Sequence, residues 1–216
     1  MTLFNARLGA WLGNPGPAGA RTWQLNGPRV GPYALLNELF GCTTDTNPYI
    51  YLSDGWHFDD LGVYEMVRRR CRYIVVSDAS ADRNYSFDDL GNVIRKIRID
   101  LAIPITFPNG IRMTAEGQHK DNLHCAVGTI WHGNVDGEAV GPGFLIYIKA
   151  TLSGDEPMDV ENYARSAPAF PHEGTMDQWF GESQFESYRA LGLHSLLTIG
   201  EGLTSRTIQG FHSCAD

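Results

Sequence analysis

Residues 49–58 read YIYLSDGWHF, in which a run typical of a β-strand leads directly into the dipeptide Asp54-Gly55. A pattern typical of a helix begins within a few residues of this dipeptide. A strand that ends in an acidic residue and a tight turn places a carboxylate at the carboxyl edge of a sheet, where open α/β sheets bind their ligands. Asp and Gly are also favoured in ordinary turns. The stretch therefore predicts either a functional carboxylate at Asp54 or a plain turn.

From residue 49 to residue 101 the chain alternates between strand-like and helix-like segments. After the turn, Asp59 or Asp60 is suited to cap a helix of about twelve residues. Residues 73–77 form a short β-branched run that predicts a buried strand. Ser86 then opens a capping box, and apolar residues continue at helical spacing as far as Leu101.

Further strand-like runs follow at residues 103–107, 124–131 and 144–150, and the last two are expected to pair as a hairpin across a polar loop. Helical patterns occupy residues 159–167 and 177–197. We predict an α/β fold with a mixed sheet and flanking helices. The domain organisation we expect is an irregular Gly/Pro-rich segment at 1–34, an α/β domain at 35–197 that begins with a short helix, and a tail without clear signal at 198–216.

Composition is that of a globular protein, with 43% hydrophobic and 19% charged residues among 216. The net charge of −8 argues against nucleic acid as the main partner, because phosphate binding needs clustered Lys and Arg. No apolar run has the length of a membrane span, and the first residues lack the features of a signal peptide. We expect a soluble, intracellular chain whose four widely spaced cysteines are free thiols.

The residues around the turn resemble the aspartate motif of bacterial patatin-like phospholipases. The likeness covers most of the chain from about residue 5 to residue 192, and it is carried by residues 52–65, 68–72, 77–79, 94–100 and 182–192. It implies the carboxyl-terminal part of a patatin-like catalytic domain, in a family whose members are often membrane-associated. In that family a Ser-Asp dyad hydrolyses acyl esters, so the resemblance implies that Asp54 is the catalytic aspartate and Gly55 the turn residue. Trp56 stands where the family has a second small residue, which changes the space around the turn.

The serine of such a dyad is missing from this sequence. A nucleophilic serine is expected on a strand-to-helix elbow with the pattern G-x-S-x-G, and no segment of the chain has that pattern. In the resembled family the serine and its oxyanion loop precede the aspartate. We therefore expect a chain that is inactive alone, as a truncated or split enzyme completed by an amino-terminal half. The competing hypothesis is a binding or scaffold module that retains the fold after losing the nucleophile.

Three other groups offer alternative chemistry. His57 follows the turn, but a triad is defined by geometry and not by adjacency. His119, Asp121, His124 and Cys125 lie close together, but their spacing matches no known zinc pattern, so we expect no metal site and no cofactor. The arginines of residues 68–72 are explained by the dipole at the end of a helix, with a phospholipid headgroup site as the alternative. The expected partners are a lipid or acyl ester, and a second segment bound along an exposed sheet edge.

Overall fold

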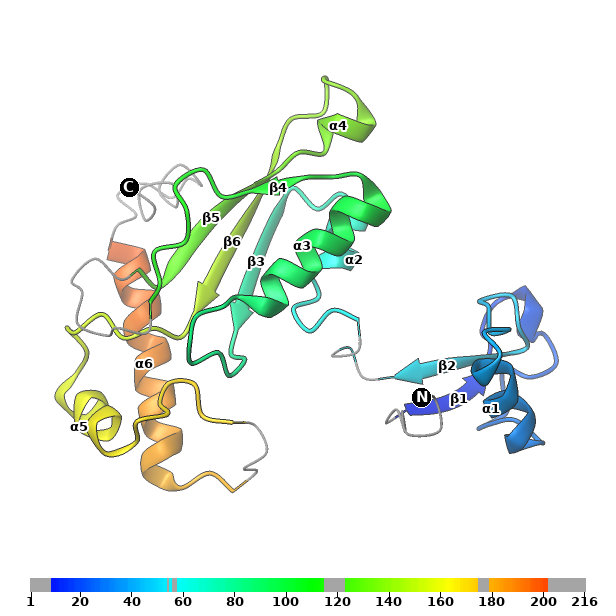
Figure 1. The fold of residues 1–216 in the computed structure, drawn as a ribbon, viewed down its shortest axis with the longest axis horizontal. Coiled ribbons are helices and arrows are strands. Elements are labelled where there is room, and N and C mark those ends of the chain that lie inside the picture. Colours follow the sequence, from blue (N-terminus) through cyan, green and yellow to red (C-terminus); the bar gives the residue numbers. More distant parts are fainter. Residues whose placement is uncertain (1–8, 54, 56–57, 115–122, 175–178, 202–216) are drawn as a thin grey trace. The chain divides into compact units, whose positions relative to one another are not determined.

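The computed structural model describes residues 9–53, 55, 58–114, 123–174 and 179–201 (Figure 1). The chain divides into two compact units, Met1–Asp60 and Leu61–Asp216. Each unit has its own sheet, and the two are described in turn. Within the described residues no helix is both long enough and apolar enough to cross a bilayer.

The first unit is a two-stranded antiparallel sheet with one helix. Its elements are β1 (Gly9–Gly13), the 3-10 helix η2 (Pro17–Gly19), α1 (Gly31–Leu39) and β2 (Tyr49–Ser53). Trp11 of β1 lies opposite Tyr51 of β2, and their ring centroids are 5.2 Å apart. The side-chain amide of Asn14 donates to the carbonyls of Asp45 and Asn47, both at 2.7 Å, and so fastens the loop before β2 to the end of β1.

This unit corrects two expectations. β1 lies inside the segment 1–34, which the composition predicts as irregular loop. The strand β2 pairs with β1 in an antiparallel ribbon and is not a strand of the larger α/β sheet. A short strand between glycines has too few apolar residues to stand out, yet pairing with β2 satisfies its backbone hydrogen bonds.

The second unit contains a four-stranded mixed sheet, which confirms the predicted fold class. Its strands are β3 (Tyr73–Asp78), β4 (Ile105–Thr106), β5 (Cys125–Ile130) and β6 (Gly143–Lys149), in the order β3-β6-β5-β4. β3 runs parallel to β6, whereas β5 is antiparallel to both β6 and β4. The predicted hairpin of the last two strand-like runs is confirmed as β5 and β6, joined through the short helix α4 (Gly133–Asp136). Figure 1 shows β6 between β3 and β5.

Two helices pack against one face of this sheet and form the main core. They are α2 (Val63–Arg68) and α3 (Asp88–Leu101), and α3 confirms the helical spacing seen in the sequence. The core combines alternate residues of β3 and β6 with one stripe of each helix: Ile74, Val76, Leu145, Tyr147, Val63, Val67, Leu90, Val93 and Ile97. Burying such apolar side chains contributes about 1.5–3 kcal/mol each relative to exposure.

Both predicted helix caps are wrong. α2 begins after Gly62, which has φ 68°, and no side chain caps it, so Asp59 and Asp60 do not have that role. α2 also has 6 residues and is shorter than expected. At α3 the position before the helix is Phe87 with φ 54°, and Ser86 does not cap it. Instead the carboxylate of Asp82 accepts the backbone N–H groups of Ser86 and Phe87 at 2.8 and 2.9 Å.

The remaining helices form a second, smaller core. α5 (Met158–Ser166) and α6 (Glu182–Glu201) confirm the two helical patterns near the end of the chain. Val160 of α5, Phe170 of the connecting loop and Leu191 of α6 are buried together. The rings of Phe170 and Tyr188 meet edge to face with centroids 4.8 Å apart.

Candidate functional site

The predicted catalytic turn is described only at its glycine. Asp54, Trp56 and His57 lie outside the described residues, so the catalytic role of Asp54 stays a prediction. The carbonyl of Gly55 accepts the backbone N–H groups of Phe58 and Asp59, both at 2.8 Å, which shows that the chain turns tightly after β2. The strand before the turn, β2, pairs antiparallel with β1 in a sheet of its own and is therefore not one of the parallel strands, whereas the sequence predicts that it belongs to the α/β sheet.

A different carboxylate stands at that edge. Asp78 is the last residue of β3 and lies opposite Lys149, the last residue of the parallel strand β6. The ammonium of Lys149 is 2.9 Å from the carboxylate of Asp78, and the two side chains are 1% and 2% exposed. Tyr147, two residues earlier on β6 and therefore on the same face, donates its hydroxyl to the same carboxylate oxygen. The backbone N–H of Ser80 donates to the other oxygen at 2.8 Å.

These contacts favour the charged form of the Asp78 carboxylate. Burial acts to raise the pKa of Asp78, but hydrogen bonds from Tyr147, Ser80 and Lys149 together lower it below its ordinary value. Burial, followed by the hydrogen bond to Asp78, raises the pKa of Tyr147, so this hydroxyl keeps its proton. The result is an anchored ion pair with its hydrogen-bond donors already directed at the carboxylate.

His172 closes this cluster from the loop after α5. Its ring is buried, and it meets the ring of Tyr85 edge to face at 4.7 Å between centroids. Its Nδ1 accepts the backbone N–H of Asp82 at 3.4 Å, while Nε2 has no hydrogen-bond partner among the described residues. Burial and the charge of Lys149 both lower the pKa of His172, so the imidazole is neutral at pH 7.

A second polar cluster surrounds His124, at the start of β5. Its Nδ1 lies 3.1 Å from the hydroxyl of Ser195 on α6, and its Nε2 lies 3.1 Å from the hydroxyl of Ser153 in the loop after β6. Burial, and next the neighbouring His194, lower the pKa of His124. Each ring nitrogen of His124 therefore lies within hydrogen-bond distance of one serine hydroxyl.

This cluster contains the serine and histidine of a serine hydrolase, but its serine is not accessible to a substrate. Ser195 is 4% exposed, and its hydroxyl also donates to the carbonyl of Leu191 at 2.9 Å. A nucleophile must reach the carbonyl carbon of a substrate, which a buried hydroxyl held by its own helix does not do. His124 and Ser195 therefore tie β5 to α6 as structural contacts.

Two carboxylates border the same cluster. Asp155 accepts from the hydroxyl of Ser153 at 2.6 Å and lies 3.2 Å from Nε2 of His194. One ligand atom from each of Asp155, Glu156 and His194 lies within 4.8 Å of the others, a spacing that suits a cation. Glu156, however, accepts backbone N–H groups of Ser153 and Gly154. Its oxygens thus hold a turn together, which accounts for the burial of this carboxylate without a metal.

The other candidate residues from the sequence either form local contacts or lie outside the described residues. His119 and Asp121 lie outside the described residues, and His124 is held by the two serines. Cys42, Cys71 and Cys125 form no disulfide with one another, and Cys214, the fourth cysteine of the prediction, lies outside the described residues. In the arginine cluster, Arg68 and Arg69 both bind the carboxylate of Glu65 at 2.7 Å on the exposed side of α2. Hydrogen bonds from these arginines lower the pKa of Glu65 to about 2.

The next arginine of that group, Arg70, has a different role. It forms an ion pair with Asp136 of α4 and has φ 59°, a conformation that ends the helix α2. Glu65 and Asp136 thus pair with three of the four arginines, which favours a solvated surface over a headgroup site. Comparison of the chain with protein-family models, curated proteins and solved structures finds no match.

Proposed function

We propose that this chain is the aspartate-bearing segment of a patatin-like acyl-ester hydrolase, and that catalysis needs a serine supplied by another segment. The resemblance of residues 52–65 and the α/β fold support this proposal. In the proposed reaction Asp54 takes the proton of the serine hydroxyl, whose oxygen attacks the ester carbonyl carbon. The alcohol leaves, and water then releases the acyl group from the serine.

The observation that carries the proposal is an edge of the four-stranded sheet at which no further strand of the described residues pairs. β3 is its outermost strand, and its residues alternate between buried and exposed. Ile74 and Val76 are buried against the helices, while Val75 is 65% exposed and Tyr73 is 48% exposed on the other face. Parallel strands are normally covered on both faces, and an edge strand with exposed apolar side chains is a template for another strand. An added segment that pairs with β3 would extend the sheet beside the carboxyl end that holds Asp78.

A binding or scaffold module is the second candidate function. It is favoured by the polar clusters at the carboxyl edge of the sheet. Asp78 and Lys149 satisfy each other, and His124 is satisfied by two serines. Groups so engaged stabilise the fold and are not poised to react with a substrate.

The first test is ester hydrolysis by the purified chain. p-Nitrophenyl butyrate is the substrate, and Asp54→Ala is the matched control. We expect neither protein to hydrolyse the ester faster than buffer does, because the sequence has no G-x-S-x-G motif. Hydrolysis that disappears in Asp54→Ala would show that a serine of this chain is the nucleophile, and the proposed need for a second segment would be wrong.

A further inference from the structure

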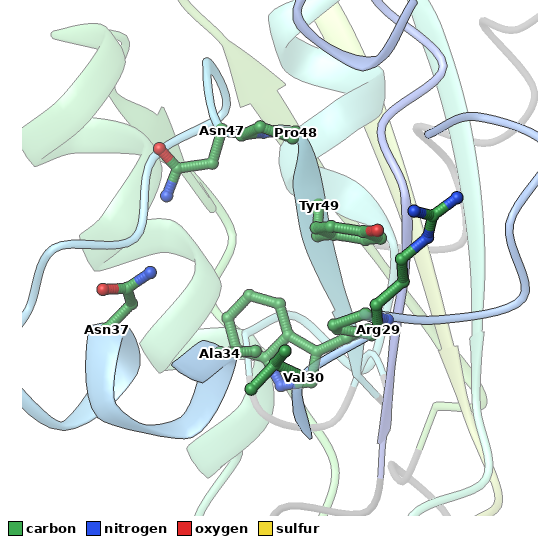
Figure 2. A pocket seen from close by; sticks show the side chains of 9 residues that line it. Arg29, Val30, Ala34, Asn37, Asn47, Pro48 and Tyr49 are labelled. Carbon is green, nitrogen blue, oxygen red and sulfur yellow. The ribbon is translucent and has the colours of Figure 1, made fainter. Parts of the chain in front are cut away.

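A cavity of about 370 Å³ lies within the first unit, between α1 and the two-stranded sheet (Figure 2). Its walls come from Trp11 of β1, Tyr49 of β2, Ala34 of α1 and the loop residues Val30, Pro48 and Arg29. The volume is in the range of small-molecule sites, about 300–1,000 Å³. All of the described lining residues belong to this unit.

The walls favour a flat, apolar ligand. Two aromatic rings, Trp11 and Tyr49, and the ring of Pro48 line the space together with Val30 and Ala34. Trp11 is itself supported from the next strand, since its ring contacts Tyr51 at 5.2 Å between centroids. Ring faces held in place by a strand pair are suited to stack on another ring, and such contacts contribute about 0.5–1.5 kcal/mol beyond area burial.

The charge at the edge of the cavity favours an anion. Arg29 is exposed and has no ion pair or hydrogen bond with any described residue. Figure 2 shows Arg29 and Tyr49 on one side of the cavity and Asn37 on the other. No carboxylate of the described residues lines the space. Asn47 is already engaged, because its amide donates to the carbonyl of Cys42 at 3.1 Å. The lining thus offers one guanidinium group in addition to its aromatic rings, and guanidinium groups bind carboxylates in a bidentate manner.

We propose that this cavity binds a small aromatic carboxylate, with its ring between Trp11 and Tyr49 and its carboxylate on Arg29. The site is separate from ester hydrolysis, since it uses neither Asp54 nor a serine. It therefore gives the chain a binding activity that persists whether or not the hydrolase proposal holds.

Isothermal titration with naphthalene-2-carboxylate tests the proposal on the full chain. The neutral analogue naphthalene-2-methanol is the matched ligand. We expect saturable one-to-one binding of the acid and about tenfold weaker binding of the alcohol, the usual contribution of one charge-assisted hydrogen bond at an exposed arginine. Arg29→Gln is expected to weaken binding of the acid about tenfold and to leave binding of the alcohol unchanged. Arg21→Gln, an exposed arginine of the same unit outside the cavity, is expected to change neither.

A second variant tests the rings. Tyr49→Leu keeps an apolar wall but removes one stacking face, so both ligands are expected to bind several-fold more weakly. Circular dichroism of each variant checks that the fold is intact, and Val30→Asp, at a 62% exposed wall position, replaces Tyr49→Leu if that variant does not fold. Either variant is expected to weaken binding of the acid. The proposal is overturned if the acid does not bind, if acid and alcohol bind equally, or if Arg29→Gln and Arg21→Gln behave alike.

Discussion

Removing the cation of the buried ion pair should be among the most destabilising single changes in the second unit. In Lys149→Met the carboxylate of Asp78 loses a partner at 2.9 Å in a place where its side chain is 2% exposed. Tyr147 and the backbone N–H of Ser80 still donate to the carboxylate, but no positive charge balances it. Breaking a buried pair by removing one partner costs about 3–5 kcal/mol. We expect that loss in the free energy of unfolding.

The double variant distinguishes the cost of an unpaired buried charge from the cost of lost packing. Asp78→Leu combined with Lys149→Met removes both charges, and such replacements of buried pairs are often neutral. The double variant should therefore be more stable than Lys149→Met alone. The exposed control is Arg165→Met, which breaks the pair of Arg165 and Glu161 at the surface of α5. That change should cost less than about 1 kcal/mol.

The assay is urea unfolding followed by circular dichroism, with the four proteins compared at one pH near 7. The reasoning predicts the order wild type, Arg165→Met, double variant, Lys149→Met from most to least stable. It is refuted if Lys149→Met costs no more than Arg165→Met, because a buried carboxylate without its cation would then carry no penalty. It is refuted equally if the double variant is less stable than Lys149→Met.

Three further results are expected. Burial lowers the pKa of His124 and of His172, so on acidification the unfolded chain binds protons before the folded chain does, and the free energy of unfolding should fall as pH drops below about 6.5. His124→Gln should make this fall shallower in urea titrations between pH 7 and 5. An unchanged dependence on pH would contradict the role given to His124. Val75→Lys should leave the urea midpoint close to wild type, whereas Val76→Lys, at a 4% exposed position facing the helices, should prevent folding as judged by circular dichroism. Glu65→Gln should leave thermal unfolding unchanged, because its two arginine partners are exposed, and a marked drop in the melting temperature would show that the pairing is structural.

The sequence predicts those elements that depend on local pattern. β-branched apolar runs identify β3, β5 and β6, and a helical repeat identifies α3, because burial of one face requires that periodicity. β1 has only five residues and glycine at both ends, so its pattern is too short to detect. The predictions of the helix caps are wrong for a related reason. Asp82 satisfies the backbone ahead of α3 from outside the helix, with Phe87 at positive φ, and no capping rule covers that arrangement.

Polar clusters are harder to predict because they depend on strand register. Asp78 and Lys149 meet only because β3 and β6 are parallel with these residues opposite each other, 71 positions apart in the chain. His124 and Ser195 meet because β5 and α6 are neighbours. The sequence does carry one signal, since Asp78 directly follows the β-branched run 73–77. The resemblance of its surroundings singles out Asp54, and the pairing of β2 with β1 depends on contacts that neither strand's own pattern encodes.

The most direct test of the proposed function is complementation. The serine-bearing amino-terminal part of a bacterial patatin-like phospholipase is supplied as a separate chain and mixed with this protein, and hydrolysis of p-nitrophenyl butyrate is measured. The account predicts hydrolysis only when both chains are present, its loss in Asp54→Ala, and a reduced rate in Val75→Lys, which places a charge on the exposed face of the edge strand. Hydrolysis that is the same with wild type and Asp54→Ala, or no gain over either chain alone, would contradict it.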